Sequence, residues 1–231
     1  MQLFYTTDVR GQLAYLPEEE ARHCIQVLRH KVGDRLQWVD GKGHWYEGEI
    51  IEAGRKNCVL SIQKQIDAYA ERSFRLHIAI APTKHMDRLE WFLEKATEIG
   101  VDEVSLLLCD HSERRKLRLD RLERVLRSAM KQSLRAWLPR LNGPIAFNDF
   151  IVQQDRGFIA HCQQDDLPLL KTHISVGEDV LVCIGPEGDF SEEEIEKALA
   201  RGLKAVSLGK SRLRTETAGI VACHTANLMN E

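Results

Sequence analysis

Residues 180–194 read VLVCIGPEGDFSEEE, a stretch that joins an apolar strand directly to a tight loop and then to a helix. The run from Val180 to Gly185 is continuously apolar, as expected of a strand that is buried on both faces. Ser191 and Glu194 have the spacing of a capping box, which opens the helix that follows. A buried strand that leads at once into a helix is the repeating unit of an α/β sheet, so this stretch predicts an α/β domain.

The loop inside this stretch contains two glycines, a proline and an acid. Gly185 and Gly188 permit close backbone approaches, and Pro186 stiffens the bend. In open α/β sheets, ligands bind beyond the carboxyl ends of the strands, so the loop is a candidate binding segment. A plain tight turn is the alternative, but it leaves the carboxylate of Glu187 unexplained.

A second strand, loop and helix follow in residues 206–219, which read VSLGKSRLRTETAG. The last helix is expected over about residues 217–230. Hydrogen-bonding groups stand at its start, on Arg214, Thr215 and Glu216. Thr215 has helix capping as an alternative role. Neither loop matches the GxGxxG or GxxxxGK[ST] patterns, so dinucleotide and P-loop nucleotide binding are disfavoured.

The remaining segments predict two domains. Residues 1–70 contain short β-rich runs and one helical stretch, which predict a small β-barrel with a single helix. Residues 73–231 alternate apolar strands with amphipathic helices, which predicts a parallel sheet covered on both faces. The expected strands are 2–6, 35–40, 44–51 and 57–63, then 76–81, 104–109, 157–162, 180–185 and 205–208; the expected helices are 17–30, 86–99, 120–137 and 217–230.

Composition excludes several classes of protein. With 231 residues, 43% hydrophobic and 29% charged, the chain has the composition of a globular protein, not of a disordered or membrane protein. It has no apolar run near the ~18 residues of a membrane span and no secretory pattern at its beginning, so we expect a cytoplasmic protein without a membrane partner. The six cysteines form no CxxC pair and the histidines form no HExxH pattern. We therefore expect reduced thiols and no metal site.

Residues 111–140 carry ten Lys and Arg against three Asp and Glu, a local charge of +7 in a chain whose net charge is −3. Such a basic segment can neutralise phosphates even in an acidic protein, because salt screens distant charges. A solvated helix face is the alternative, and charge alone does not choose between the two. Trp45, Trp91 and Trp137 are candidates for stacking on bases, although Trp91 and Trp137 also suit a core or a dimer interface.

The two loop segments together resemble a known family. IGPEGDFSEEEIEKA (184–198) and LGKSRLRTETAGIVA (208–222) are similar to the two signature loops of the RsmE family, the 16S rRNA uridine N3-methyltransferases of the SPOUT superfamily. Residues 23–34 and 39–50 resemble its PUA-like domain, and 84–101 resemble the first helix of its catalytic domain. The chain departs from the family where Gly188-Asp189 replaces Gly-Gly and where Lys131-Gln132-Ser133 replaces Glu-Gln-Ser.

The resemblance implies a C-terminal SPOUT-type α/β domain with a trefoil knot, an N-terminal PUA-like β-barrel that binds RNA, a homodimer, and 16S rRNA or the small ribosomal subunit as partner. It also implies an S-adenosylmethionine site made of Ala160, His161, Ile184, Gly185, Pro186, Glu187, Gly188, Leu208, Gly209, Leu213, Arg214 and Thr215. For His161, the alternative to cofactor binding is a structural role, in which the imidazole makes its hydrogen bonds within the protein.

The chemistry of uridine N3 suggests roles for three of the charged residues. N3 must lose a proton before methylation, so Glu187 or Glu216 is expected to act as general base. Glu216 stands slightly behind Glu187, because it has pairing with Arg214 as its alternative role. Arg214 is expected to stabilise charge on the uracil oxygens. The predicted RNA contacts are Arg10, Arg29, Lys84, Arg114, Arg115, Lys116, Gln132 and Arg135.

Two other functions remain as alternatives. The first is a SPOUT enzyme that methylates the ribose 2′-hydroxyl of tRNA or rRNA. Such enzymes have an asparagine in their first loop, and the corresponding residues 158–163 contain none. The second is an RNA-binding protein without catalytic activity, against which the two intact loops argue.

Overall fold

The computed structural model describes residues 2–231. The chain forms two compact units, each with its own core. The N-terminal unit contains residues 2–71 together with Arg127–Leu138, and the C-terminal unit contains Arg72–Leu126 and Pro139–Glu231. The basic segment predicted from the sequence therefore supplies residues to both units.

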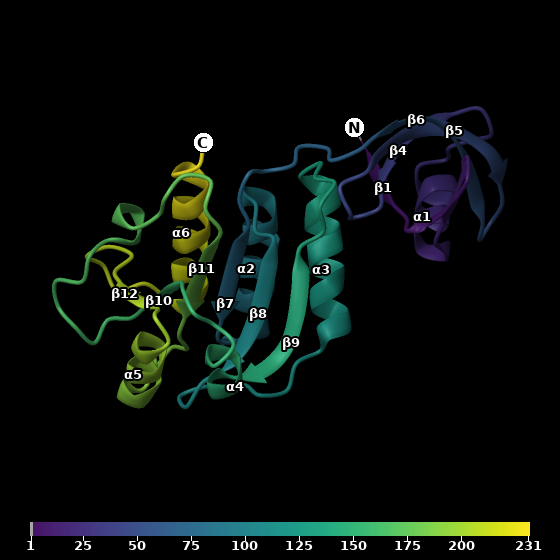
Figure 1. Cartoon of the computed structure of the whole chain (residues 1–231). Helices are drawn as coiled ribbons and strands as arrows, with labels where there is room; N and C mark the ends of the chain where they lie inside the picture. Colours follow the sequence, from purple (N-terminus) through teal and green to yellow (C-terminus); the bar gives the residue numbers. More distant parts are fainter. Residues whose placement is uncertain (1) are drawn as a thin grey trace. The chain divides into compact units, whose positions relative to one another are not determined.

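The N-terminal unit is built on a six-stranded mixed sheet with strand order β1-β4-β5-β6-β3-β2 (Figure 1). Only the pairing of β1 with β4 is parallel. Trp38 and Tyr46 stack in the core with ring centroids 5.5 Å apart. The strands are β1 (Leu3–Tyr5), β2 (Asp8–Arg10), β3 (Leu13–Leu16), β4 (Arg35–Val39), β5 (Trp45–Ala53) and β6 (Cys58–Ile66).

The predicted helix over residues 17–30 is shorter and less regular in the structure. Helix α1 (Glu18–Arg22) continues as a π-helical turn (His23–Val27), which buries Cys24 in the core. Arg29 then adopts a left-handed backbone conformation with φ 62°, which cannot continue a helix. The sequence analysis also missed β2 and β3, which are three and four residues long, too short for an alternating pattern to stand out.

The C-terminal unit contains a six-stranded sheet with strand order β12-β10-β11-β7-β8-β9, and every pairing in it is parallel. The strands are β7 (Leu76–Ile80), β8 (Glu103–Leu108), β9 (Arg140–Ala146), β10 (Phe158–Ala160), β11 (Val180–Ile184) and β12 (Lys204–Val206). This confirms the predicted α/β class and parallel sheet. Because β10, β11 and β12 are neighbours, their carboxyl ends lie at one edge.

Helices cover both faces of this sheet. Helices α2 (Met86–Ile99) and α6 (Thr215–Leu228) pack on each other, and α6 contacts β7 and β11. Helices α4 (Phe147–Ile151) and α5 (Glu192–Ala200) pack together and contact other strands. A Cβ at Gly219 would lie 2.6 Å from Cε2 of Phe92, so the close approach of α6 to α2 requires glycine there.

Helix α3 (Leu119–Gln132), strand β9 and helix α4 differ from the predictions for residues 120–151. Helix α3 ends earlier than the predicted residue 137, because Leu134 adopts a left-handed conformation with φ 55° and the N–H of Arg135 donates to the carbonyl of Met130. This arrangement is a helix-ending motif that normally carries glycine. Strand β9 and helix α4 were not predicted, because Gly143 and Pro144 read as breakers.

Candidate functional site

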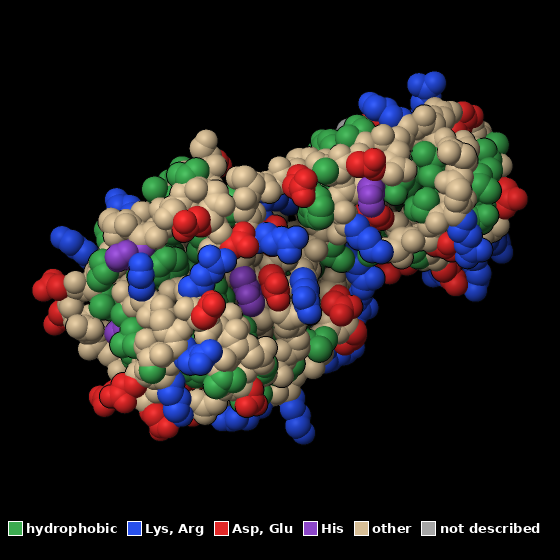
Figure 2. All heavy atoms as spheres, in the orientation of Figure 1, with side chains coloured by type: hydrophobic (Ala, Val, Ile, Leu, Met, Phe, Trp, Pro, Cys, Tyr) green, Lys and Arg blue, Asp and Glu red, His purple; other side chains and the backbone are tan. Residues whose placement is uncertain are grey.

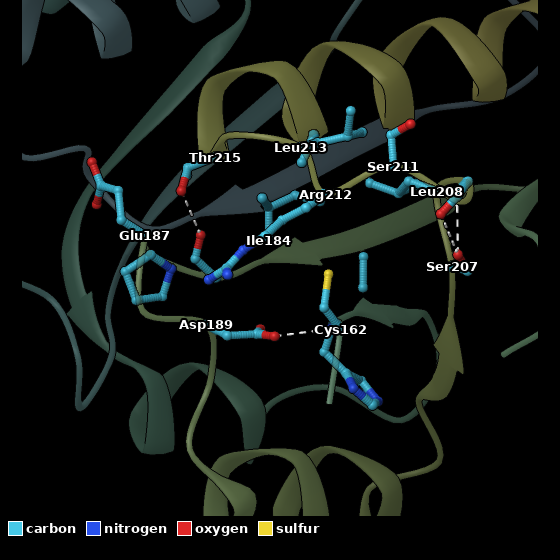
Figure 3. Close-up of a pocket in the computed structure, with 16 residues that line it drawn as sticks. Cys162, Ile184, Glu187, Asp189, Ser207, Leu208, Ser211, Arg212, Leu213 and Thr215 are labelled. Atoms are coloured by element: carbon cyan, nitrogen blue, oxygen red, sulfur yellow. Dashed lines mark hydrogen bonds between the residues drawn. The ribbon is translucent and has the colours of Figure 1, made fainter. Parts of the chain in front are cut away.

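A cleft lies beyond the carboxyl ends of β10, β11 and β12 (Figure 3). Three segments far apart in the sequence line it: residues 160–162 after β10, residues 184–189 at the end of β11, and residues between 207 and 218 after β12. The cleft encloses about 100 Å³ and opens to solvent.

Two hydrogen bonds hold these segments together. The hydroxyl of Thr215 donates to the carbonyl of Gly185 over 3.1 Å, a buried bond that joins the start of α6 to the loop after β11. The N–H of Cys162 donates to the Asp189 carboxylate over 2.8 Å and joins the loop after β10 to the same loop. Both bonds are visible in Figure 3. The cleft therefore has walls fixed by internal contacts.

The sequence analysis predicted most of the residues that line this cleft. Ten of the twelve predicted cofactor residues line it, and the exceptions are Gly188 and Arg214. Both exceptions are exposed. Cys162, expected with Ala160 and His161 as a third wall of the site, also lines the cleft. Five further lining residues were not predicted, and their only signal was adjacency to the two glycine loops: Asp189, Ser207, Ser211, Arg212 and Ala218.

Glu187 is the carboxylate at the exposed side of the cleft. Its Oε1 accepts a hydrogen bond from the backbone N–H of Lys84 over 3.0 Å, which fixes the side chain. Arg114 donates two hydrogen bonds to the carbonyl of the same Lys84, from Nε at 3.0 Å and from Nη2 at 2.7 Å. Lys84 thus connects the candidate general base to a candidate RNA-binding arginine.

Glu216 lies elsewhere. It is 6% exposed, does not line the cleft, and is 3.7 Å from Nε of Arg88 on α2. Its proposed ion pair with Arg214 is therefore wrong: Arg214 is the exposed residue before α6, whereas Glu216 points to α2 because it lies two positions further round the first turn. Between the two predicted bases, Glu187 is the one that lines the cleft.

His161 lines the cleft and is 8% exposed. Burial lowers its pKa, and the nearby Asp189 opposes that effect. Its Nδ1 accepts a hydrogen bond from the N–H of Gln163 over 3.3 Å, so in the neutral ring Nε2 carries the proton. That buried Nε2 has no hydrogen-bond partner among residues 2–231, which makes it a donor available to a ligand.

The predicted RNA contacts of the C-terminal unit lie on loops that follow β7 and β8. Lys84 forms an ion pair with Glu113 over 2.9 Å, which raises its pKa. Arg115 and Lys116 are exposed, and within residues 2–231 neither has an acidic partner within 4.0 Å. On the face shown in Figure 2, Lys and Arg side chains are interspersed with Asp and Glu side chains.

In the N-terminal unit, Arg10 is exposed, pairs with Asp8 over 2.7 Å and lies over the ring of Tyr15. Arg29 and Gln132 are exposed, and Arg135 is half-buried. Trp45 is only 4% exposed and stacks on Tyr69 with centroids 4.7 Å apart, so the idea that it stacks on bases is wrong.

Residues 2–231 contain neither a cluster of metal ligands nor a helix that could span a membrane. Among residues 2–231, no three His, Cys, Asp or Glu side chains are grouped as metal ligands. None of the helices found in that range has both the length and the apolar character needed to cross a bilayer.

Comparison with known proteins identifies two matching family models. An RNA methyltransferase domain matches residues 70–227, and an RNA methyltransferase PUA domain matches residues 16–63. Among curated proteins, ribosomal RNA small subunit methyltransferase E of Rickettsia conorii is 26% identical over 217 residues, which cover 92% of this chain and 88% of that protein.

Solved structures are similar over the whole chain. A protein of Porphyromonas gingivalis described as a "probable rRNA-methyltransferase" is 45% identical, with a TM-score of 0.90 and coverage of 99% of both chains. Ribosomal RNA small subunit methyltransferase E of Neisseria gonorrhoeae, solved with S-adenosylmethionine bound, is 25% identical with a TM-score of 0.86, covering 100% of this chain and 98% of that chain.

Proposed function

Because the chain belongs to the RNA methyltransferase family that includes ribosomal RNA small subunit methyltransferase E, we propose that it methylates N3 of a uridine in 16S rRNA with S-adenosylmethionine as methyl donor. The observation that carries the proposal is the cleft at the carboxyl ends of β10, β11 and β12, lined by both signature loops. That the Neisseria gonorrhoeae relative binds S-adenosylmethionine supports the same assignment.

The lining of the cleft fits this methyl donor. Apolar side chains, among them Ile184, Leu208 and Leu213, suit the adenine ring. The Nε2–H of His161 is a buried donor without a partner and suits a ligand nitrogen or oxygen. The donor set contains oxygen, nitrogen and backbone groups, so these residues would hold the cofactor.

Bound S-adenosylmethionine supplies an electrophilic methyl group on a sulfonium centre. Glu187, whose Oε1 is held by the N–H of Lys84, removes the proton from uridine N3 with its carboxylate. Loss of this proton would leave N3 with the lone pair that a methyl transfer requires. Alignment of the two reactants is worth on the order of 7–11 kcal/mol of the barrier. Arg214, exposed at the start of α6, stabilises the charge that develops on the uracil oxygens.

RNA binding is assigned to both units. The proposed contacts in the C-terminal unit are Lys84, Arg114, Arg115 and Lys116, and those in the N-terminal unit are Arg10, Arg29, Gln132 and Arg135. We assign residues 1–70 to a PUA-like RNA-binding domain and residues 73–231 to the methyltransferase domain, which the ranges of the two matching family models support.

A homodimer with a trefoil knot in each catalytic domain is part of the same proposal. Support for a subunit contact comes from the layer formed by α2 and α6, on which Trp91 is 45% exposed and Leu228 is 57% exposed. The trefoil knot is proposed from the family to which the C-terminal unit belongs. A cytoplasmic location follows from the substrate, because rRNA is modified where ribosomes assemble.

The test combines binding with product analysis. Calorimetry of the full chain should show uptake of S-adenosylmethionine, and incubation with 16S rRNA or small subunits from cells that lack the protein should yield N3-methyluridine. A 2′-O-methylated nucleoside would assign the chain to the ribose-methylating enzymes. Binding of RNA without any uptake of S-adenosylmethionine would leave a non-catalytic RNA-binding protein.

A further inference from the structure

Asp189 has a backbone conformation that favours glycine. Its φ is +63°, in the left-handed region, and its N–H closes a turn onto the carbonyl of Pro186 over 2.9 Å. Glycine adopts this conformation at little cost, whereas aspartate tolerates it with some strain. The turn alone therefore does not explain an aspartate at this position, whereas a contact of its side chain, which glycine lacks, would.

The Asp189 carboxylate accepts two hydrogen bonds from backbone N–H groups of different segments. Oδ2 accepts from Cys162 over 2.8 Å, and Oδ1 accepts from the adjacent Phe190 over 2.8 Å. Figure 3 shows the first of these bonds crossing from the loop after β11 to the loop after β10. Bonds to a carboxylate are stronger than bonds between neutral groups, so one side chain binds two loops firmly.

One end of this bridge is anchored in the core and the other end is a wall of the cleft. Phe190 is fully buried and its ring lies 5.3 Å from that of Phe147. Cys162 is exposed and lines the cleft with the adjacent His161. A second contact runs in parallel, because the amide of Gln163 donates to the carbonyl of Phe190. The loop after β10 is therefore attached to the core through Asp189 and the adjacent Phe190.

We propose that Asp189 is a positioning residue for the methyl-donor cleft: its carboxylate holds the loop after β10 in the place where Cys162 and His161 form one wall. The inference rests on the proposed function, since it takes S-adenosylmethionine as the ligand of this cleft. It assigns to Asp189 an indirect role, through the backbone of Cys162, and no contact with the reacting atoms.

Two substitutions and one matched control test this role. Asp189→Gly removes both acceptors and relieves the backbone strain, and Asp189→Asn keeps one acceptor in a residue that tolerates the conformation. Asp166→Gly is the control, because Asp166 also has a positive φ, of 60°, but is exposed and outside the cleft. Each full-length variant is measured by calorimetry with S-adenosylmethionine and with S-adenosylhomocysteine, by thermal unfolding, and by amide exchange.

The expected pattern separates positioning from folding. Asp189→Gly should weaken both ligands about tenfold, the effect of one lost charge-assisted bond, and should speed exchange at Cys162. Its melting temperature should stay within about 3 °C of the wild type, because relief of strain offsets the lost bonds. Asp189→Asn should show an intermediate affinity, and Asp166→Gly should bind both ligands as the wild type does.

Three results would overturn the inference. The first is binding of both ligands by Asp189→Gly within twofold of the wild type. The second is weaker binding of S-adenosylmethionine with unchanged binding of S-adenosylhomocysteine, which would mean a direct contact between the carboxylate and the positively charged donor. The third is faster exchange throughout the C-terminal unit, which would mean a general structural role. If the wild type itself bound neither ligand, the proposed function would fail instead.

Discussion

Replacing Thr215 with valine should cost the chain a buried hydrogen bond while keeping the shape of the side chain. The Thr215 hydroxyl donates to the carbonyl of Gly185 over 3.1 Å, and both residues are buried. The substitution leaves that carbonyl without its partner, which costs about 1–3 kcal/mol. For a unit of about 150 residues, a loss near 2 kcal/mol lowers the melting temperature by roughly 4–8 °C.

Urea unfolding measures this loss directly, with Thr172→Val as the matched control. The Thr172 hydroxyl also donates to a backbone carbonyl, that of Leu169 over 2.7 Å, but it is exposed, so water replaces the bond. We expect the control to change the free energy of unfolding by less than about 0.5 kcal/mol. Equal losses for Thr215→Val and Thr172→Val would refute the idea that the bond between the two loops contributes to the stability of the unit.

Three further predictions concern catalysis, RNA binding and pH. Glu187→Gln should lower single-turnover methylation about 10²- to 10⁴-fold while keeping S-adenosylmethionine binding within a few-fold; an unchanged rate would remove Glu187 from the role of base. Replacing Arg114 and Arg115 with glutamine should weaken RNA binding and reduce the slope of log affinity against log salt by about 1.4–1.8, and an unchanged slope would mean a solvated surface. Burial lowers the pKa of His161 below its usual 6.5, so at acid pH the unfolded chain takes up a proton that the folded chain resists, and stability falls as the pH drops. His161→Asn should therefore lose less stability than the wild type between about pH 7 and pH 5 in urea titrations; equal losses would show that His161 is not the group responsible.

The elements that define the cleft were predictable because their local signals agree. Apolar runs mark β7, β8, β10 and β11, and the capping box is present as expected, with the Ser191 hydroxyl accepting from the N–H of Glu194 over 3.3 Å. Helix α2 ends where Gly100 predicts. Parallel strands place their following loops at one edge of the sheet, so the loops after β11 and β12 meet there, although β10 lies between the two strands.

What could not be predicted depends on contacts between distant residues. The direction of the Glu216 side chain is set by Arg88, which lies more than a hundred residues earlier in the chain. The end of α3 depends on a left-handed leucine at position 134, which no propensity rule anticipates. The role of Lys84 as the backbone link between Glu187 and Arg114 is likewise a product of tertiary packing.

The pairing of β7 with β11 has a consequence for biosynthesis. Residues 76–80 pair on one side with the nearby strand β8, but their partner on the other side, residues 180–184, comes roughly 100 residues later in the chain. At elongation rates of about 5–20 residues per second, β7 waits roughly 5–20 s for that partner to be translated. Helix α6, which closes the cleft with Thr215, emerges later still. A nascent chain therefore has no complete cleft until α6 leaves the ribosome, and truncation anywhere before residue 215 leaves the cleft incomplete.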